Sequence, residues 1–348
     1  MKKLLVTLVC AVFAALALVG FTACGGENSD LEKVNLVAVD AETVVPNEQF
    51  DYFVVPEPAA SAKIKATSSS PNGFKMVGDL QQLYGGNNGY PQAVIVAKSQ
   101  LVGSEGAFIS SFMSALQQNT EWMMAETTEI SAVVDAVTSH LTEGMAPTFN
   151  AKNLTKEVIK NCGIRFEYAY NCKEEVKSFL TALKAVQPSV NDNISDNFFI
   201  GENHTDAYTE NAVTVYAPDG APALALAGLI DGAVSSNSLG KAVNYNIVAA
   251  STIQTHVTGA NPDADICILP VNLAANLLGS GENYKMLGTV THGNLYIISA
   301  KTAEQIAVDN LFELRGKTVG VVNLAAVPGL TFKLILNKYG IEYSEPQT

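Results

Sequence analysis

Short apolar runs alternate with amphipathic stretches along most of the chain, and this alternation predicts parallel sheets covered by helices. In the second half, buried strands are expected at 213–219, 245–251 and 263–270, with one or two more within 285–300. The final apolar run, which begins at Lys317, predicts another strand. The expected helices of this half are 222–233, 252–259, 271–281, 302–316 and the helix that follows the final strand.

The first half continues the same alternation. Strands are expected at 34–39, 51–58 and 91–102, and long helices fill most of 105–186. Shorter helical segments are expected at 43–50 and 59–68. The stretch 187–212 is rich in Asn, Asp and Ser and lacks periodicity, which predicts a linker.

The order of these elements is unusual. The segment 317–343 reads as a strand, a glycine turn and a helix, and such a unit needs a following parallel strand. The strand at 34–39 can supply it. We therefore expect 317–343 and 34–39 to share one sheet, and the chain to be a circularly permuted two-lobed α/β protein.

The first 24 residues have the features of an export signal. Lys2 and Lys3 precede an apolar run from Leu4 to Val19, and small residues then lead to Cys24. This pattern resembles a bacterial lipoprotein signal in which Cys24 is lipidated, with 25–30 as a tether. A plain secretory peptide and a single transmembrane anchor are the alternatives. The expected location is extracytoplasmic, on the bacterial cell membrane.

Charge and motifs exclude several functions. The formal net charge is −13 and no basic stripe is present, which argues against a nucleic-acid partner. Metal-ligand spacings, a P-loop and a nucleophile elbow are absent, so no metal, cofactor or enzyme activity is expected. Cys162 and Cys172 could form a disulfide after export or remain free and buried.

Candidate ligand-binding residues lie where strands give way to helices, because ligands of open parallel sheets bind beyond the carboxyl ends of the strands. Helix N-termini there offer free N–H groups, and small residues admit a ligand to the backbone. The candidates are Glu57, Asp219, Gly220, Ala221, Ser251, Thr252, Asn272, His292, Asn323, Ala325, Ala326 and Pro328.

Each candidate also has a structural interpretation. Asp219 suits a turn or helix cap, and Ser251 and Thr252 are typical caps. Glu57, held between two prolines, could instead form a hinge ion pair or sit at a helix N-terminus. His292 could simply be solvated.

Several segments together resemble one protein family. The stretches VTVYAPDGAPALALAGLIDG, DADICILPVNLAANL and LRGKTVGVVNLAAVPGLTFKLILNKYGI are similar to substrate-binding proteins of ABC transporters in the nitrate, sulfonate and thiamine-precursor group. DYFVVPEPAAS and GYPQAVIVAKSQL resemble a later part of that family, so the order is rotated. The resemblance implies a circularly permuted type II periplasmic-binding-protein fold. One lobe would comprise 31–98 and 301–348, and the other 99–186 and 213–300.

The function implied by the resemblance is capture of a small molecule between two lobes and its delivery to an ABC permease and its ATPase. Two carboxylates, Glu57 and Asp219, favour a neutral or cationic heteroaromatic ligand such as a thiamine precursor. A sulfonate or nitrate receptor is an alternative, since helix N-termini alone can hold an anion. An enzyme on the same fold and a ligand-free surface sensor also remain open.

Overall fold

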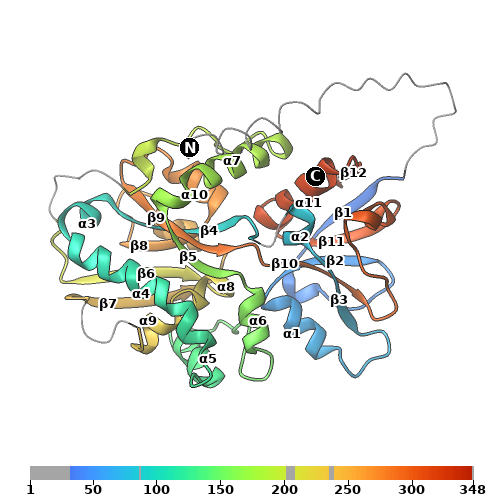
Figure 1. Cartoon of the computed structure of the whole chain (residues 1–348), viewed down its shortest axis with the longest axis horizontal. Coiled ribbons are helices and arrows are strands. Elements are labelled where there is room, and N and C mark those ends of the chain that lie inside the picture. The colour runs from blue at the N-terminus through green and yellow to red at the C-terminus, as the bar shows by residue number, and fades with distance from the viewer. Residues whose placement is uncertain (1–31, 86–87, 201–207, 235–238, 347–348) are drawn as a thin grey trace, which may run out of the picture. The chain divides into compact units, whose positions relative to one another are not determined.

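Two six-stranded sheets organise the protein in the computed structural model, which describes residues 32–346 except 86–87, 201–207 and 235–238. The expected lipidation site and signal segment lie outside these residues. The first sheet has the order β12-β1-β11-β2-β10-β3 (Figure 1). Its strands are β1 (Val34–Val39), β2 (Tyr52–Pro56), β3 (Phe74–Asp79), β10 (Leu295–Ala300), β11 (Thr318–Val322) and β12 (Tyr343–Ser344).

The first sheet confirms the expected pairing of distant segments. β1 lies parallel to β11, with Asn35 opposite Thr318, and parallel to β12 on its other edge, with Val34 opposite Tyr343. Both neighbours of β1 therefore come from the segment that begins at Lys317. The hydrogen-bonding groups left open by that segment are satisfied by β1, as a parallel βαβ unit requires.

The second sheet has the order β5-β9-β4-β8-β6-β7. β6, β7 and β8 run parallel, whereas β4 is antiparallel to β8, β9 is antiparallel to β4, and β5 is antiparallel to β9. The predicted α/β class with two sheets is thus confirmed. The strands are β4 (Pro91–Lys98), β5 (Ile164–Tyr168), β6 (Ala212–Pro218), β7 (Ala242–Val248), β8 (Ile266–Pro270) and β9 (Tyr284–His292).

Two connections pass between the sheets. β3 of the first sheet leads through a short helix to β4 of the second, and β9 of the second leads through Gly293 and Asn294 to β10 of the first. β3 pairs with β10 and β4 pairs with β9, so the crossing strands are neighbours in both sheets. By strand pairing, β4 belongs with the second sheet and β10 with the first.

Helices cover the faces of both sheets (Figure 1). None of the helices in the described part of the chain is long and apolar enough to cross a membrane. The helices are α1 (Ala59–Ala66), α2 (Leu80–Tyr84), α3 (Ser99–Ser104), α4 (Gly106–Met124), α5 (Ile130–Thr138), α6 (Lys156–Asn161), α7 (Ala169–Val186), α8 (Ala221–Leu224), α9 (Ala227–Asp231), α10 (Val271–Leu278) and α11 (Val327–Lys338).

The largest apolar core continues from one sheet to the other. α7 packs on β9 and α11 packs on β2 and β11, and the two helices contact each other (Figure 1). Phe179 of α7 stacks on Tyr90 with ring centroids 5.3 Å apart and meets the edge of Tyr84 at 5.8 Å. Two further cores fill the opposite faces, beneath α4 and α5 in the second sheet and beneath α1 in the first.

Three expected elements differ from the structure. β5 interrupts the stretch 105–186, most of which the sequence predicted to be helical. The prediction missed this strand because its sequence, IRFEY, is short and lies between two helices. Within 302–316 only a 3-10 helix forms, at Val308–Leu314; the Asn310 side chain binds backbone groups at both Gln305 and Ala307 and so competes with helical hydrogen bonds.

The third difference concerns 43–50, which forms turns instead of a helix. Asn47 accepts hydrogen bonds from the backbone N–H groups of Gln49 and Phe50, the pattern of an Asx turn.

The stretch 187–200, expected to be part of a linker, packs against the second sheet and its helix α10. Ser195 N–H donates to the Gly279 carbonyl, and Ile200 N–H donates to the Met286 carbonyl.

Candidate functional site

The candidate residues lie at the carboxyl ends of strands in both sheets. In the first sheet, Glu57 follows β2 and Asn323 follows β11. In the second sheet, Asp219 follows β6 and Asn272 follows β8, while Ser251 lies beyond the end of β7. The structure thus places candidates on both sheets, as the two-lobed interpretation requires.

Glu57 is a buried carboxylate, with only 1% of its surface exposed. Its oxygens accept hydrogen bonds from the Ser61 backbone N–H at 2.9 Å and the Ser61 hydroxyl at 2.6 Å, both in the first turn of α1. Burial raises the pKa of Glu57, whereas hydrogen bonds from Ser61 and from the Asn161 side chain lower it. Its contacts are those of a carboxylate at a helix N-terminus, the structural alternative for this residue.

Asp219 connects β6 to a distant loop. Its Oδ2 accepts from the Thr148 hydroxyl at 2.6 Å and the Thr148 backbone N–H at 2.7 Å, and Oδ1 accepts from Gly220 N–H at 2.8 Å. Gly220 has φ +101 and open space where a side chain would stand, and Ala221 begins α8 as a buried residue. The Cβ position of Gly220 therefore faces open space, although the residue itself is buried.

One stretch of chain contacts the carboxyl ends of both sheets, and we name 140–162 the bridging segment. At its start, Thr142 N–H donates to the Ile247 carbonyl of β7 at 2.8 Å, and Thr148 then reaches Asp219. At its end, the Asn161 carbonyl accepts from the Tyr296 hydroxyl of β10 at 3.1 Å. The bridging segment, which the sequence did not single out, thus connects the second sheet to the first.

The other second-sheet candidates differ in their contacts. Ser251 and Thr252 are exposed, and the Thr252 hydroxyl donates to the Ala249 carbonyl at 3.0 Å, which is turn chemistry. Asn272 is half-buried in the first turn of α10, and its Oδ1 is a buried atom without a partner among the described residues. An unpaired buried amide oxygen is costly, so Asn272 has capacity for an additional donor.

The loop after β11 is built for a sharp turn. Asn323 has φ +58, the left-handed conformation that Asn tolerates better than most residues, and its carbonyl accepts from Ala326 N–H at 2.9 Å. Ala325 is exposed, whereas Pro328 is buried inside the first turn of α11. The turn leaves the N-terminus of this 12-residue helix beside small side chains.

His292 is buried at the end of β9, with 3% of its surface exposed, which differs from the solvated alternative. Its Nε2 lies 2.9 Å from the Thr289 hydroxyl and 3.5 Å from Glu167 Oε2, while Nδ1 has no partner among the described residues. Burial, with a smaller effect of Arg165, lowers the pKa of His292 to about 3. The imidazole is therefore neutral near pH 7.

A cavity of about 420 Å³ lies beside this histidine. Gly163, with φ +61, forms one wall and packs so closely that an added Cβ would lie 2.3 Å from the Gly293 oxygen. Polar and apolar groups both line the space, among them Asn88, Gln117, Thr120, Lys160, Arg165 and Phe166. Of the candidates from sequence, His292 is the one that borders this cavity.

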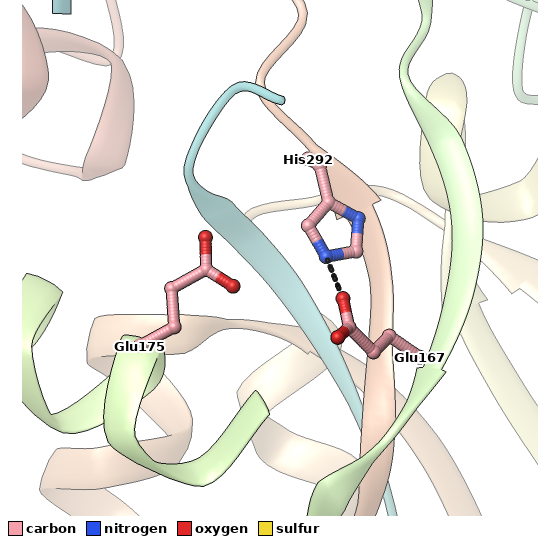
Figure 2. Close-up of side chains that lie close together, drawn as sticks. All are labelled: Glu167, Glu175 and His292. Carbon is pink, nitrogen blue, oxygen red and sulfur yellow. Dashed lines mark ion pairs between the residues drawn. The ribbon is translucent and has the colours of Figure 1, made fainter. Parts of the chain in front are cut away.

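Two glutamates join His292 to form the group of side chains best suited to hold a metal ion in the described part of the chain. Glu167 of β5, Glu175 of α7 and His292 of β9 each offer one ligand atom, and these atoms all lie within 4.8 Å of one another. Figure 2 shows both carboxylates on the Nε2 side of the ring. Sequence analysis missed Glu167 because β5 was not predicted, and nothing in the helical pattern of α7 distinguished Glu175.

The described cysteines are poorly suited to nucleophilic catalysis. Cys162, Cys172 and Cys267 are buried and free, so no disulfide joins the first two in the structure. Burial raises the pKa of all three thiols, to about 11 for Cys172. Thiols with raised pKa values are protonated near pH 7, and the thiolate is the nucleophile.

Comparison with solved structures gives distant likenesses, among them two binding proteins. No family model and no curated protein matches the sequence. The oligopeptide-binding protein AppA from Bacillus subtilis, in complex with a nonapeptide, is 8% identical with a TM-score of 0.28, over 80% of this chain and 58% of AppA. The periplasmic murein tripeptide-binding protein MppA, in an unliganded open form, is 9% identical with a TM-score of 0.23, over 72% of this chain and 49% of MppA.

Proposed function

We propose that this protein is an extracytoplasmic solute-binding lipoprotein that captures a small polar or heteroaromatic molecule and delivers it to an ABC importer. The observation that carries the proposal is the connection between the sheets. Two neighbouring crossing strands join them, and parallel strands in each sheet end at candidate ligand contacts. In the family that the sequence resembles, ligand binds between lobes joined by two such crossings.

In this proposal each lobe is built around one sheet, and the lobes separate and close about the crossings β3–β4 and β9–β10. Ligand contacts on both lobes favour the closed state. The order of segments would be a rotated version of the family's order, which the pairing of β1 with β11 and β12 supports. Lipidation of Cys24 would hold the receptor at the membrane beside its permease and ATPase.

The proposed ligand contacts are the junction residues of both sheets. Asn272 is the sharpest of them, because its unpaired Oδ1 can accept a hydrogen bond without breaking one. Glu57 and Asp219 favour a neutral or cationic ring, such as a thiamine precursor, once their partners in the bridging segment move. An anionic ligand is the second candidate, favoured by the N-terminus of α11 beside Ala325 and Ala326.

A thermal-shift screen of the mature chain with thiamine precursors, sulfonates, nitrate and amino acids tests the proposal. A ligand at 100 times its Kd stabilises the folded state by about 2.7 kcal/mol, which a thermal shift detects. Stabilisation without consumption supports a receptor. Consumption of the ligand would indicate an enzyme instead, and silence throughout would leave a ligand-free surface sensor.

Calorimetry on two variants then locates the site. Asn272→Ala should weaken binding of the ligand found in the screen while leaving the unliganded protein stable. Asn276→Ala in the same helix is the matched control: its side chain accepts from Asn191 N–H at 2.6 Å, so its loss lowers stability but not affinity. Equal affinity of Asn272→Ala and the unmodified chain would remove Asn272 from the site.

A further inference from the structure

We propose that Glu167, Glu175 and His292 form a binding site for one divalent transition-metal ion, with Zn²⁺ as the best fit. The site goes beyond solute capture and assigns His292 a different partner from the one expected from sequence. Its three ligands come from three elements, β5, α7 and β9, which the fold brings together at one end of the second sheet (Figure 2).

The spacing of the ligand atoms suits a metal ion. His292 Nε2 and Glu167 Oε2 are 3.5 Å apart. Two ligands bound to Zn²⁺ at about 2.0–2.1 Å with tetrahedral angles lie about 3.3 Å from each other. The Glu175 atom, within 4.8 Å of the others, belongs to an exposed side chain that can move the remaining distance. Little rearrangement is therefore needed to complete three bonds.

The imidazole is directed into the cluster. Only 3% of the His292 surface is exposed. Among the described residues, the imidazole makes its polar contacts through Nε2, with Thr289 and with Glu167. Figure 2 shows the other nitrogen facing away from both carboxylates. A buried, neutral imidazole whose Nε2 faces two carboxylates is a typical arrangement of zinc ligands.

Charge at the cluster favours a dication. Burial raises the pKa of the Glu175 carboxyl, and repulsion from the Glu167 carboxylate raises it further. Among the described residues, Arg165 forms an ion pair with Glu167: its Nη2 lies 3.8 Å from Glu167 Oε2, a distance at the limit of an ion pair. A bound dication would neutralise both carboxylates at once. One imidazole with two carboxylates suits Zn²⁺, whereas Mg²⁺ and Ca²⁺ prefer oxygen ligands alone.

Three protein ligands leave at least one coordination position for water or another group. Of the three ligands, His292 also lines the 420 Å³ cavity. The ion would also fasten β5 and α7 to the crossing strand.

Titration of the metal-free mature chain with ZnCl₂ by isothermal calorimetry, in excess Mg²⁺, tests the proposal. We expect one Zn²⁺ per chain at high affinity, and at least about tenfold weaker binding in Glu175→Gln and in Glu167→Gln. Glu174→Gln is the matched control, since Glu174 is an exposed glutamate adjacent to Glu175 on α7. Its affinity should equal that of the unmodified chain.

Co²⁺ provides a second readout. Co²⁺ bound with a low coordination number absorbs visible light. This absorption should appear in the unmodified chain and in Glu174→Gln, and it should be lost in Glu175→Gln. Three results would each contradict the proposed site. The first is that no Zn²⁺ binds with high affinity, and the second is that Glu174→Gln weakens binding as much as the ligand variants do. The third is that binding is unchanged in both Glu175→Gln and Glu167→Gln. The titration uses no solute, so its failure leaves the receptor proposal standing, and a failed solute screen leaves the metal site standing.

Discussion

The two sheets are held together by an apolar contact and by a polar contact, and the two differ in what they allow. The apolar contact joins α7 to α2 through the rings of Phe179, Tyr84 and Tyr90, and α7 also packs against α11. The polar contact joins the bridging segment to the first sheet through Asn161, Tyr296 and Glu57. Apolar packing is non-directional, whereas hydrogen bonds need fixed geometry.

In the receptor that we propose, this difference assigns the opening movement to the polar contact. Few hydrogen bonds hold the bridging segment against the first sheet, and ligand groups or water could replace them. The rings between α7 and α2 have no such replacement, because exposing them to water costs about 25 cal/mol per Å². The apolar contact is therefore expected to persist while the polar contact changes. The following substitutions test that assignment.

The largest effect is expected from Phe179→Ala. Phe179 is 1% exposed, and its removal leaves a cavity between Tyr84 and Tyr90. The free energy of unfolding should fall by about 3–5 kcal/mol, measured by urea denaturation. Tyr170→Ala is the control, because this ring lies on the same helix but is 66% exposed. Similar losses in both variants would contradict the packing role of Phe179.

Thr148→Val should have the next largest effect. The substitution removes the 2.6 Å hydrogen bond to the Asp219 carboxylate but keeps the backbone donor and the side-chain shape. Hydrogen bonds to charged groups contribute about 1.5–3 kcal/mol, so the unfolding free energy should fall by that amount. Thr142→Val removes a bond to the neutral Ile247 carbonyl and should cost about 1 kcal/mol. The opposite ranking would show that Asp219 gains nothing from Thr148.

Tyr296→Phe should weaken the polar contact by about 1 kcal/mol, because it removes the hydroxyl that donates to the Asn161 carbonyl. Amide hydrogen exchange is the sharper measurement. Exchange in α6 should accelerate several-fold while α7, held by the apolar contact, stays unchanged within the same sample. Acceleration in both helices would mean that the two contacts open together.

The smallest effect is a change in pH dependence for Glu57→Gln. Burial raises the pKa of Glu57, so the folded state binds more protons than the unfolded state between the ordinary glutamate pKa and the raised value. Stability of the unmodified chain should therefore decline, relative to the variant, as pH rises through that window. Urea denaturation from pH 4 to 7 measures this, with the exposed Glu48→Gln as reference. A constant difference across this range would contradict the raised pKa.

The fold was predictable where local pattern and pairing agree. The β1–β11 pair follows from an apolar strand and a strand–helix unit that needed a partner. β9 and β10 were expected within one stretch, but their division between two sheets depends on the positive φ of Gly293 and on Gln81, whose side chain bonds both backbone groups of Leu295. The periodicity of apolar residues does not reveal contacts between distant segments, such as that of Gln81 with Leu295.

The candidate site was predictable only in part. Strand ends identify Asn272 and Asp219 by position, since the carboxyl ends of parallel strands are where helices begin. Thr148 and Asn161 lie within the stretch 105–186 that was expected to be mostly helical, and only the folded chain brings them to Asp219 and Tyr296. Glu167 was missed with β5, although the alternation of IRFEY is a strand signal at the shortest useful length.

The position of β1 between β11 and β12 also has a consequence for how the chain matures. Ribosomal synthesis produces β1 near the beginning and both of its neighbours near the end. The first sheet cannot close until nearly all of the described chain is available, and pairing over such long separations is intrinsically slow. The pairings of β1 are therefore expected to form late in the folding of the first sheet, after β11 and β12 are available.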